Sequence, residues 1–546
     1  MINKSALLCA LLLTSALFSC GSSDSKGDGS GHMYNAALLN NPQSLDPQFA
    51  CDESSETVIS NLYSRLMKLD SSGNPVCSNA ESYEISPDGL TYTFRLRSDN
   101  CWFFDYNDDD KIDEAECFPV TAHDYVFAFR RILDPDMCSP FADEFSCIKG
   151  GSAIINGSAP ADSAGVTAAD STTLVIELEY PSADFLTLLA SNAASPCNED
   201  FFLSTKGRYG LDDKSVMSNG AFFVRQWFFD PYGSNNILYM KKNSANSYED
   251  DEILPSFLSF TIEKNEADIK KLFKDGGIDC ITTLNAKAYN KKKYTVDAYR
   301  SLTLGIVFNP DSTVFSNENL RKSLAYSIDY NELSQALDSD AEAARGIIPP
   351  AVSLLGRSYR ELSSDRLMNR FSEEEAKSCY SSAKSELNTE SFDSVKLLVC
   401  TDTVDSGCLH VITQRWQDIL GLYIGIEEVT AAEFDSRIEN GEYQLALYPV
   451  RGLYNSGVSV LEQFAEDPLI KVSGEAEQTI KSLRKCPDSS ELVELFADAE
   501  KKILSQYSFI PVFYKNTYLV AGNANEDIGY DAFSGAVDFR YAKNYD

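Results

Sequence analysis

The acidic stretch DYNDDDKIDEAE, from Asp105 to Glu116, is the part of this chain whose residue types and spacing point most directly to chemistry. It places seven carboxylates and one lysine within twelve residues. Calcium-binding loops of twelve positions present oxygen ligands at positions 1, 3, 5, 7, 9 and 12, because Ca²⁺ prefers hard oxygen donors. Here those positions hold Asp105, Asn107, Asp109, Lys111 (through its carbonyl), Asp113 and Glu116. The spacing predicts a structural calcium site, and a solvated acidic loop is the alternative.

One position of this stretch departs from the calcium-loop pattern. The sixth position, where glycine makes the sharp turn, is Asp110. Aspartate tolerates a left-handed backbone better than most residues, at some energetic cost. No helix is expected to lead into the stretch, so it would be an isolated loop. Cys101 and Cys117 bracket it and could close it with a disulfide, which would reduce the entropy lost on ordering the loop.

Cysteine and histidine supply few ligands for any other metal site. The chain has fourteen cysteines, three histidines and no CxxC pair, so a zinc site of the Cys/His type is poorly provided for. Beyond residue 20 twelve cysteines remain, an even number that permits disulfides in an exported protein. The pairs nearest in sequence are Cys101 with Cys117, Cys138 with Cys147, and Cys400 with Cys408.

Motifs of known catalytic machinery are missing from the sequence. There is no GxSxG elbow, no P-loop, no GxGxxG after a strand and no HExxH. The histidines are His32, His123 and His410, and the last two stand near expected helix starts, where capping or surface roles are usual. Carboxylate pairs are too numerous to single one out, so residue types alone do not exclude a glycosidase. We expect a protein that is not an enzyme.

The N-terminal residues have the pattern of an export signal. A lysine near the start precedes an apolar run, Ala6 to Phe18, that is too short to span a bilayer. The following LFSC resembles a bacterial lipobox, which predicts a signal peptide over 1–19, a lipidated Cys20 and a flexible tether over 20–33. An ordinary cleaved signal with Cys20 as a bystander is the alternative. We expect the protein in the cell envelope, lipid-anchored on the outer face of the cytoplasmic membrane or periplasmic.

The composition describes a globular chain with a strongly acidic surface. Hydrophobic residues make up 43% of the 546 residues, which is enough for a packed interior. The formal net charge of −35 argues against nucleic acid and against an anionic lipid surface as partners. Any contact with the membrane is therefore expected through the lipid anchor only.

Apolar periodicity beyond the tether predicts a mixed α/β architecture without obvious linkers between domains. Alternation around a Pro-Asp-Gly turn predicts a hairpin over 82–97, and helical spacing predicts helices over 55–70, 120–133 and 317–337. The segment 394–430 has the order strand, helix, strand of a βαβ unit. The missing linkers suggest domains between which the chain crosses more than once.

Eight segments in order resemble one family, the oligopeptide-binding proteins of bacterial ABC importers, which are family 5 extracellular solute-binding proteins. The resemblance runs from about Tyr34 to the C-terminus. The segments are SLDP, ESYEISPDGLTYTFRLR, PVTAHDYVFAFRRILDP with SPFA after it, GVTAADSTTLVIEL, SNGAFFVRQW, LRKSLAYSIDYNEL, LGLYIGIEEV and IPVFYKNTYLV. The acidic stretch 105–116 is an insertion relative to this family.

The resemblance implies an α/β, two-lobed clam-shell of the periplasmic-binding-protein type (type II, cluster C) with an extra inserted domain. Its two lobes would close around a ligand in the cleft between them. The implied boundaries are 34–69 for the first segment of lobe 1, 70–200 for the inserted domain, 201–300 for the second segment of lobe 1, 301–508 for lobe 2 and 509–546 for the last segment of lobe 1.

The resemblance also implies three groups of ligand contacts and a late tyrosine. They are Cys51, Asp52, Glu53 and Ser54 after SLDP; Asn219, Gly220 and Phe222 of SNGAF; Tyr448, Val450, Arg451, Leu453, Tyr454 and Asn455 after NGEYQLAL; and Tyr514. For the first two groups, a plain exposed loop and a structural Asn-Gly turn are the alternatives.

The third group departs from the family at one position. Relatives carry there an aspartate that pairs with the amino terminus of the peptide, and this chain has Leu453. Since a buried cation without a partner is costly, either Asp52 or Glu53 substitutes, or the ligand is not a free-amine peptide. Arg451 could instead bind a carboxylate.

The family therefore implies a monomeric, lipid-anchored receptor that captures oligopeptides and delivers them to the permease of an ABC importer. A non-peptide solute in the same fold (a nickel chelate, an oligosaccharide or an opine) is the first alternative, and scarce histidine speaks weakly against nickel. A hydrolase or a surface adhesin is the second. No cofactor is expected apart from the structural Ca²⁺.

Overall fold

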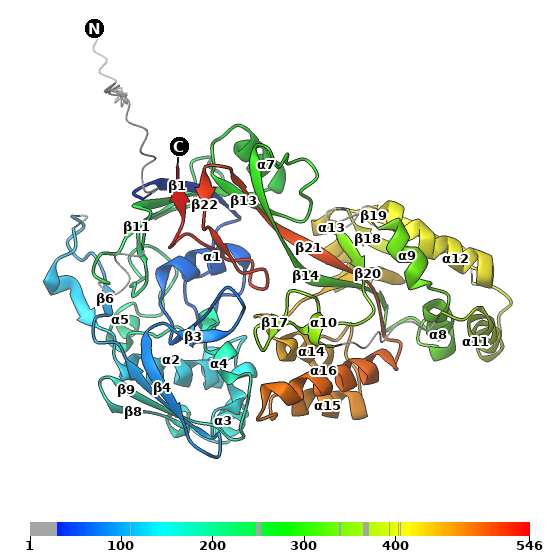
Figure 1. Cartoon of the computed structure of the whole chain (residues 1–546), viewed down its shortest axis with the longest axis horizontal. Helices are drawn as coiled ribbons and strands as arrows, with labels where there is room; N and C mark the ends of the chain where they lie inside the picture. Colours follow the sequence, from blue (N-terminus) through cyan, green and yellow to red (C-terminus); the bar gives the residue numbers. More distant parts are fainter. Residues whose placement is uncertain are drawn as a thin grey trace, which may run out of the picture.

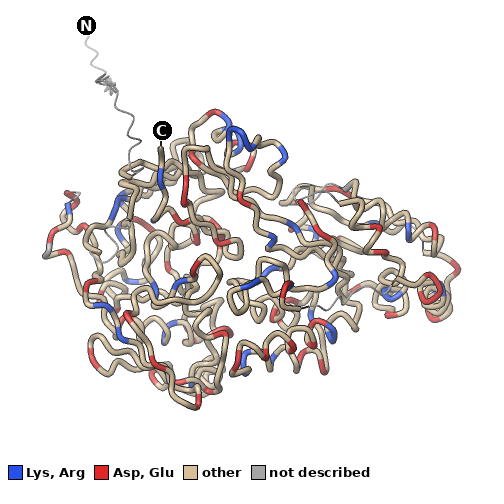
Figure 2. The backbone as a smooth tube through the Cα atoms, viewed as in Figure 1, with Lys and Arg blue, Asp and Glu red and all other residues tan. Residues whose placement is uncertain are grey.

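The computed structural model describes residues 30–109, 111–246, 253–337, 340–363, 371–392, 394–401, 403 and 406–545. The expected signal peptide, the lipidation site Cys20 and most of the tether lie outside these residues. Figure 1 shows two lobes side by side, one built from the first half of the chain and its C-terminal end, the other from residues after about 310. Figure 2 shows acidic residues spread over both lobes, as the net charge requires. Within the described residues, no helix is both long and apolar enough to cross a membrane.

The first lobe contains a four-stranded sheet with the order β1-β12-β11-β10. Its strands are β1 (Met33–Leu39), β10 (Phe222–Phe228), β11 (Ile237–Lys242) and β12 (Phe257–Glu263). Helix α1 (Glu53–Leu62) packs beside it and begins at Asp52, whose carboxylate caps the helix by accepting a hydrogen bond from the Ser55 amide. Segments far apart in sequence thus share this lobe, because β1 pairs in parallel with β12.

The inserted domain is a second four-stranded sheet, with the order β4-β5-β9-β8. It comprises β4 (Ala80–Ile85), β5 (Thr91–Leu96), β8 (Val166–Asp170) and β9 (Thr173–Glu177), with α2 (Ala122–Leu133), α3 (Gly151–Ile155), α4 (Phe185–Leu188) and α5 (Glu199–Ser204) around it. The expected hairpin is confirmed as β4 and β5, and α2 begins at Thr121 with a capping box completed by Asp124. Two short ladders join this domain to the rest of the lobe. In one, β2 (Met67–Leu69) pairs with β3 (Pro75–Cys77), and in the other, β6 (Cys101–Phe103) pairs with β7 (Cys117–Pro119).

The second lobe surrounds a sheet with the order β13-β21-β14-β20-β18-β19, to which β15 (Ala341–Ala343) adds on β21. Its strands include β13 (Cys280–Thr283), β18 (Val395–Cys400), β19 (Ile424–Val429) and β20 (Leu445–Val450). The helices are α8 (Glu318–Tyr326), α9 (Tyr330–Ala336), α10 (Tyr359–Leu362), α11 (Glu373–Glu386), α12 (His410–Leu420), α13 (Ala431–Glu439), α14 (Gly457–Glu466), α15 (Glu475–Leu483) and α16 (Ser489–Leu504).

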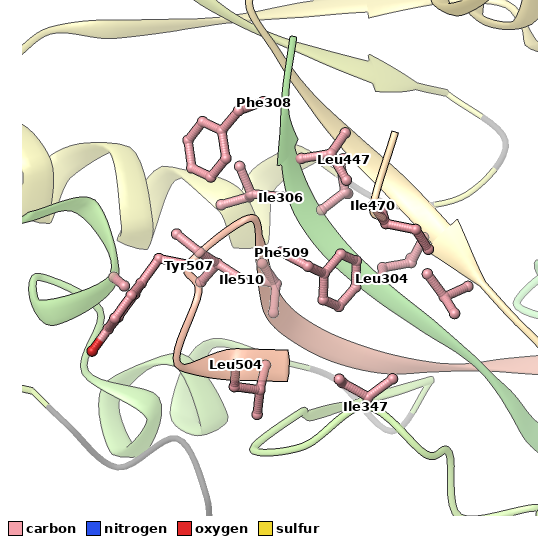
Figure 3. Close-up of a cluster of buried hydrophobic side chains, with 14 of the residues drawn as sticks. Leu304, Ile306, Phe308, Ile347, Leu447, Ile470, Leu504, Tyr507, Phe509 and Ile510 are labelled. Atoms are coloured by element: carbon pink, nitrogen blue, oxygen red, sulfur yellow. The ribbon is translucent and has the colours of Figure 1, made fainter. Parts of the chain in front are cut away.

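Two long antiparallel strands, β14 (Tyr294–Phe308) and β21 (Phe509–Gly522), connect the lobes (Figure 1). In the second lobe their side chains form the core: Figure 3 shows Leu304, Ile306 and Phe308 near Phe509 and Ile510. At their other end Tyr518 and Val520 pack near α7 (Glu266–Lys274) of the first lobe. The chain therefore crosses between the lobes on a pair of strands, which can serve as a hinge between them.

Two expected helices differ from the structure. The helix expected over 55–70 ends at Leu62, and the apolar residues Leu66 and Met67 belong to the β2 region, because helical spacing cannot distinguish them from buried residues of a following strand. The helix expected over 317–337 is divided into α8 and α9, since the Asp329 side chain accepts a hydrogen bond from the Asn331 amide and begins a new helix. The βαβ unit over 394–430 is confirmed, with β18 parallel to β19.

Candidate functional site

Two cavities lie between the lobes and share Leu453 and Tyr530 in their walls. The first has a volume of about 500 Å³ and the second about 680 Å³. Both take wall residues from the two lobes, and together they are large enough for a ligand of several residues.

The first cavity combines an apolar wall with three carboxylates. Leu302 of β14, Val450 of β20 and Ile470 give the apolar surface, and Glu53, Glu266 and Asp467 bring carboxyl groups from both lobes. The phenol of Tyr448 donates a hydrogen bond of 3.0 Å to the Asp467 carboxylate, which holds that carboxylate at the wall. This cavity is suited to a ligand that carries a positive charge beside an apolar group.

An ion pair joins the two lobes at the rim of this cavity. Arg451, directly after β20, donates to the Glu53 carboxylate in the first turn of α1 at 3.0 Å. The Glu53 side chain is 58% exposed, so the pair contributes less than about 1 kcal/mol to holding the lobes together. The two residues are therefore available for contacts with a ligand.

The second cavity is lined by charges of both signs. The Arg65 guanidinium donates to the Asn192 side chain, whose amide donates in turn to the Glu56 carboxyl group. Burial raises the pKa of Glu56 to about 8, although the Asn192 hydrogen bond works against that shift. Burial, assisted by the like charge of Arg540, lowers the pKa of Arg65. A ligand in this cavity meets guanidinium groups beside a carboxyl group that carries its proton at neutral pH.

Direct contacts join the two lobes beside the second cavity. The Asp184 carboxylate of the first lobe accepts hydrogen bonds of 2.7 Å from the hydroxyls of Tyr454 and Ser456 of the second lobe. Arg484 of the second lobe donates to the Glu144 carbonyl at 2.7 Å. Burial raises the pKa of Asp184. These contacts couple the cleft to the relative position of the lobes.

All six residues of the third predicted group lie at these cavities. Tyr448, Val450 and Arg451 line the first cavity, Tyr454 and Asn455 line the second, and Leu453 lines both. Asn455 also accepts a hydrogen bond of 2.9 Å from the Ser353 amide, which fixes its orientation.

The residues after SLDP have different positions. Glu53 lines the first cavity, whereas the Asp52 carboxylate is occupied in capping α1 and the Ser54 hydroxyl donates to the Leu39 carbonyl at 2.6 Å. Cys51 is exposed. Tyr514 of β21 is buried in the second lobe, with the Arg360 guanidinium 5.6 Å from the centre of its ring. Of these residues the structure brings only Glu53 to the two cavities described above.

Asn219, Gly220 and Phe222 are buried in the first lobe and are not among the wall residues of either cavity. The Asn219 side chain accepts from the Ser64 amide and donates to the Ser64 carbonyl. A Cβ atom on Gly220 would lie 2.6 Å from the Leu62 carbonyl carbon. The structure therefore places this turn in contacts within the first lobe, outside the walls of both cavities.

Replacing Gly220 with alanine is expected to destabilise the first lobe by about 1–3 kcal/mol, because the new methyl group meets backbone atoms that cannot move aside. Thermal unfolding measures the loss. Ligand affinity of the folded fraction should be unchanged, and a variant of normal stability with weakened affinity would contradict this assignment.

Several residues of the two cavity walls could not be predicted from any motif or pattern in the sequence. They are Glu56, Arg65, Lys68, Glu266, Asp467, Tyr530 and Arg540. They come from segments up to several hundred residues apart, and only the fold brings them together. Glu56 stands in the mostly polar segment ESSETVISNL of α1, so no local feature of the sequence marks it out.

The acidic stretch forms the connection between β6 and β7, at the side of the first lobe that faces away from the second lobe (Figure 1). Among the described residues, no group of three or more His, Cys, Asp or Glu side chains stands close enough to hold a metal. No disulfide joins any two of the cysteines that the structure describes, so none of the three pairs considered from the sequence is bonded. Burial, and then the Cys117 thiol, raise the pKa of Cys101 to about 12.

Comparisons with known proteins agree with this architecture. Residues 74–468 match the family described as bacterial extracellular solute-binding proteins, family 5 Middle. The chain is similar to the dipeptide-binding protein DppE of Bacillus subtilis (24% identity, 98% of this chain and 97% of that protein) and to its oligopeptide-binding protein OppA (24%, 93% and 94%).

Solved structures share the fold. Listeria monocytogenes OppA bound to peptide matches with a TM-score of 0.72 at 21% identity, over 94% of this chain and 99% of that chain. The pheromone receptor PrgZ matches with a TM-score of 0.73 at 23% identity, with the same coverage. The expected two-lobed, α/β periplasmic-binding-protein fold is confirmed. The chain belongs to the bacterial extracellular solute-binding proteins of family 5.

Proposed function

We propose that this protein captures oligopeptides in the cleft between its lobes and delivers them to an ABC importer. The observation that carries the proposal is the pair of cavities whose walls come from both lobes and whose surroundings include hydrogen bonds from one lobe to the other. A ligand seated there contacts both lobes, so its binding free energy favours the closed form. Relatives named as dipeptide- and oligopeptide-binding proteins support a peptide as that ligand.

The wall chemistry favours a ligand with a protonated amine at the first cavity. Leu453 provides no carboxylate, but Glu53, Glu266 and Asp467 do. Of the two substitutes considered from the sequence, Asp52 is engaged as a helix cap and Glu53 faces the cavity. Glu53 is thus the proposed partner of the ammonium group, and main-chain hydrogen bonds along the cleft would tolerate varied side chains.

Closure of the lobes is the proposed signal to the permease. Only the liganded form holds both halves of the recognition surface in one arrangement, so the importer distinguishes loaded from empty protein. The protein would act as a monomer, with binding rather than catalysis as its role, as in the family to which it belongs.

We place this receptor at the outer face of the cytoplasmic membrane or in the periplasm, anchored through a lipid on Cys20. The apolar run and LFSC in the sequence support this placement. Replacing Cys20 with alanine should move the protein from the membrane fraction to the soluble fraction, and unchanged fractionation would count against the anchor.

A non-peptide solute is the second candidate, and Leu453 in place of the family's aspartate favours it. Native mass spectrometry of the purified protein distinguishes the two candidates. Bound masses that fragment as peptides support the first, whereas a bound mass without amino-acid fragments supports the second. Conversion of the bound compound during incubation would overturn both.

A further inference from the structure

A basic segment of the first lobe stands out from this acidic chain. Seven lysines and only two acidic residues lie between Lys270 and Lys293, whereas the whole chain has a net charge of −35. Lys270 pairs with Glu266 of the same helix, α7, at 2.6 Å. Five exposed lysines of the segment form what we call the lysine face: Lys271, Lys274, Lys291, Lys292 and Lys293.

Three aromatic rings hold the two parts of the lysine face together. The centre of the Phe273 ring on α7 lies 5.6 Å from that of Tyr289 and 5.0 Å from that of Tyr294, and the two tyrosine rings are 5.5 Å apart. Lys274 directly follows the phenylalanine, and the lysines 291–293 lie between the two tyrosines. Because the rings pack together, all five lysines occupy one region of the surface. Figure 2 shows basic residues gathered there, around α7 at the top of the first lobe.

Asp279 connects this region to the beginning of the described chain. Its carboxylate accepts a hydrogen bond of 2.7 Å from the Asn35 amide of β1 and lies 3.6 Å from the His32 ring nitrogen. Its amide donates to the Asn35 carbonyl at 2.7 Å. Since α7 also contacts β1, the lysines of α7 lie beside the N-terminal segment.

The lysines of the loop are held near the same aspartate. The Asp279 carbonyl accepts a hydrogen bond of 3.2 Å from the Gly522 amide at the end of β21. The adjoining Asn523 donates through its amide to the Lys293 carbonyl at 3.3 Å and through its side chain to the Lys292 carbonyl at 2.7 Å. Both parts of the lysine face therefore lie close to the first described residues.

We propose that the lysine face binds the anionic headgroups of the membrane that holds the lipid anchor, as a second contact beside the lipid. The inference rests on the proposed anchor at Cys20, which precedes the first described residue, Ser30, by ten residues. Even fully extended, those residues span about 35 Å, so Ser30 and the surface around it stay within that distance of the bilayer. Lysines that close to an anionic membrane are attracted to it.

The acidic remainder of the chain opposes this contact only weakly. Repulsion between exposed charges is largely screened beyond a Debye length of about 8 Å at physiological ionic strength. Only the surface turned toward the membrane lies within that distance, and there the five lysines outnumber Asp275, the exposed acidic residue among them. Repulsion of the remaining surface favours the orientation in which α7 faces the bilayer and the rest of the molecule points away from it.

Binding of the anchor-free protein to lipid vesicles tests the proposal. The chain from Gly21 onward keeps every residue that the structure describes and lacks the expected signal and lipid. Vesicles of phosphatidylcholine, alone or mixed with an equal amount of phosphatidylglycerol, are sedimented with it. We expect binding to the anionic vesicles at about 50 mM salt, at least about tenfold weaker binding at about 500 mM salt, and none to phosphatidylcholine alone. The mass of the mature full-length protein reports the lipid on Cys20 separately, so failure of the anchor and failure of the lysine face are distinguishable.

A variant without four charges of the lysine face decides whether these lysines make the contact. Each lysine near an anionic surface contributes about fivefold in affinity, so the four substitutions should weaken binding by about a hundredfold or more. They are Lys271→Gln, Lys274→Gln, Lys291→Gln and Lys292→Gln. The matched control removes as many charges from exposed lysines of the second lobe and should bind as the unmodified protein does; it carries Lys377→Gln, Lys481→Gln, Lys485→Gln and Lys501→Gln.

Circular dichroism checks that both variants fold, as substitutions of exposed side chains allow. Three results would overturn the proposal: no binding of the unmodified protein to anionic vesicles, equal binding to neutral and anionic vesicles, or equal binding of the unmodified protein and the folded lysine-face variant.

Discussion

Replacing Asp184 with alanine is expected to weaken ligand binding by about a hundredfold. Its carboxylate accepts hydrogen bonds from Tyr454 and Ser456 of the opposite lobe, both at 2.7 Å. A hydrogen bond to a charged group contributes about 1.5–3 kcal/mol, so losing the pair costs the closed form about 3 kcal/mol, which is about a hundredfold in affinity. Asp184 is not among the wall residues of the two cavities, so the loss would report closure rather than lost ligand contact.

Calorimetric titration with the ligand identified by mass spectrometry measures this change. The matched control is Asp162→Ala, which removes an exposed aspartate whose partner, Arg130, belongs to the same domain. That variant should bind as the unmodified protein does. Ser456→Ala should have an intermediate effect. If Asp184→Ala binds within threefold of the unmodified protein, closure does not depend on this contact.

Ligand affinity should also increase as the pH falls from 7 to 5, because closure buries the carboxyl group of Glu144. Burial raises the pKa of Glu144 from 4.5 to about 7, even though Arg484 of the second lobe acts in the opposite direction. Glu144 is one of the wall residues of the second cavity and is 5% exposed. Opening of the lobes returns it to water and to its ordinary pKa.

The direction of this pH dependence follows from the raised pKa of Glu144. A carboxyl group whose pKa is higher in the closed form binds a proton on closure, so its contribution is complete below pH 4.5 and is lost as the pH rises through 7. In that window each pH unit changes the affinity by up to about tenfold, and the whole window by about two orders of magnitude. The charged groups around Glu144 are Asp143, Glu462, Glu466 and Arg484.

Titrations at pH 5, 6 and 7 with a ligand that does not itself titrate in this range measure the slope. Glu144→Gln should abolish most of it, and its affinity at pH 7 should equal or exceed that of the unmodified protein. Glu56→Gln removes the other buried carboxyl group at the second cavity, whose pKa is raised to about 8, and so measures any share of the slope that belongs to Glu56. A slope that persists in Glu144→Gln would assign the proton uptake to another group.

Elements with strong local signals could be predicted from the sequence. The hairpin of β4 and β5 has strict alternation around a Pro-Asp-Gly turn, and α2 has both an apolar face and a capping box. These features depend on residues within one turn or one strand of each other. The same local rules placed one long helix over 317–337, because nothing in its apolar spacing shows that Asp329 begins a new one.

The hinge could be predicted only in part. The apolar half of β14 is evident from the residues after Leu302, but the strand begins at Tyr294, in a polar segment that follows a run of lysines. That half is a strand because it pairs with β21, more than 200 residues later. Long-range pairing of this kind leaves no periodic signal in either segment.

The residues of the two cavity walls could likewise be predicted only in part. Resemblance to the family placed the residues 448–455 at the cleft, because a strand end keeps its position when the fold is kept. It also suggested Asn219 and Gly220, which the structure places in a buried turn against Leu62 and Ser64. Glu56, Arg65 and Arg540 could not be found, since their proximity exists only in the folded chain.

Titration of ligand-free protein with a mixture of short peptides tests the central claim most directly, with Leu453→Trp as the comparison. Leu453 is 40% exposed and lines both cavities, so an indole ring there would fill the passage between them without disturbing the core. We predict saturable binding of peptides, one per chain, to the unmodified protein and its loss in a normally folded Leu453→Trp variant. Absence of peptide binding to the unmodified protein, or equal binding to both proteins, would contradict the account.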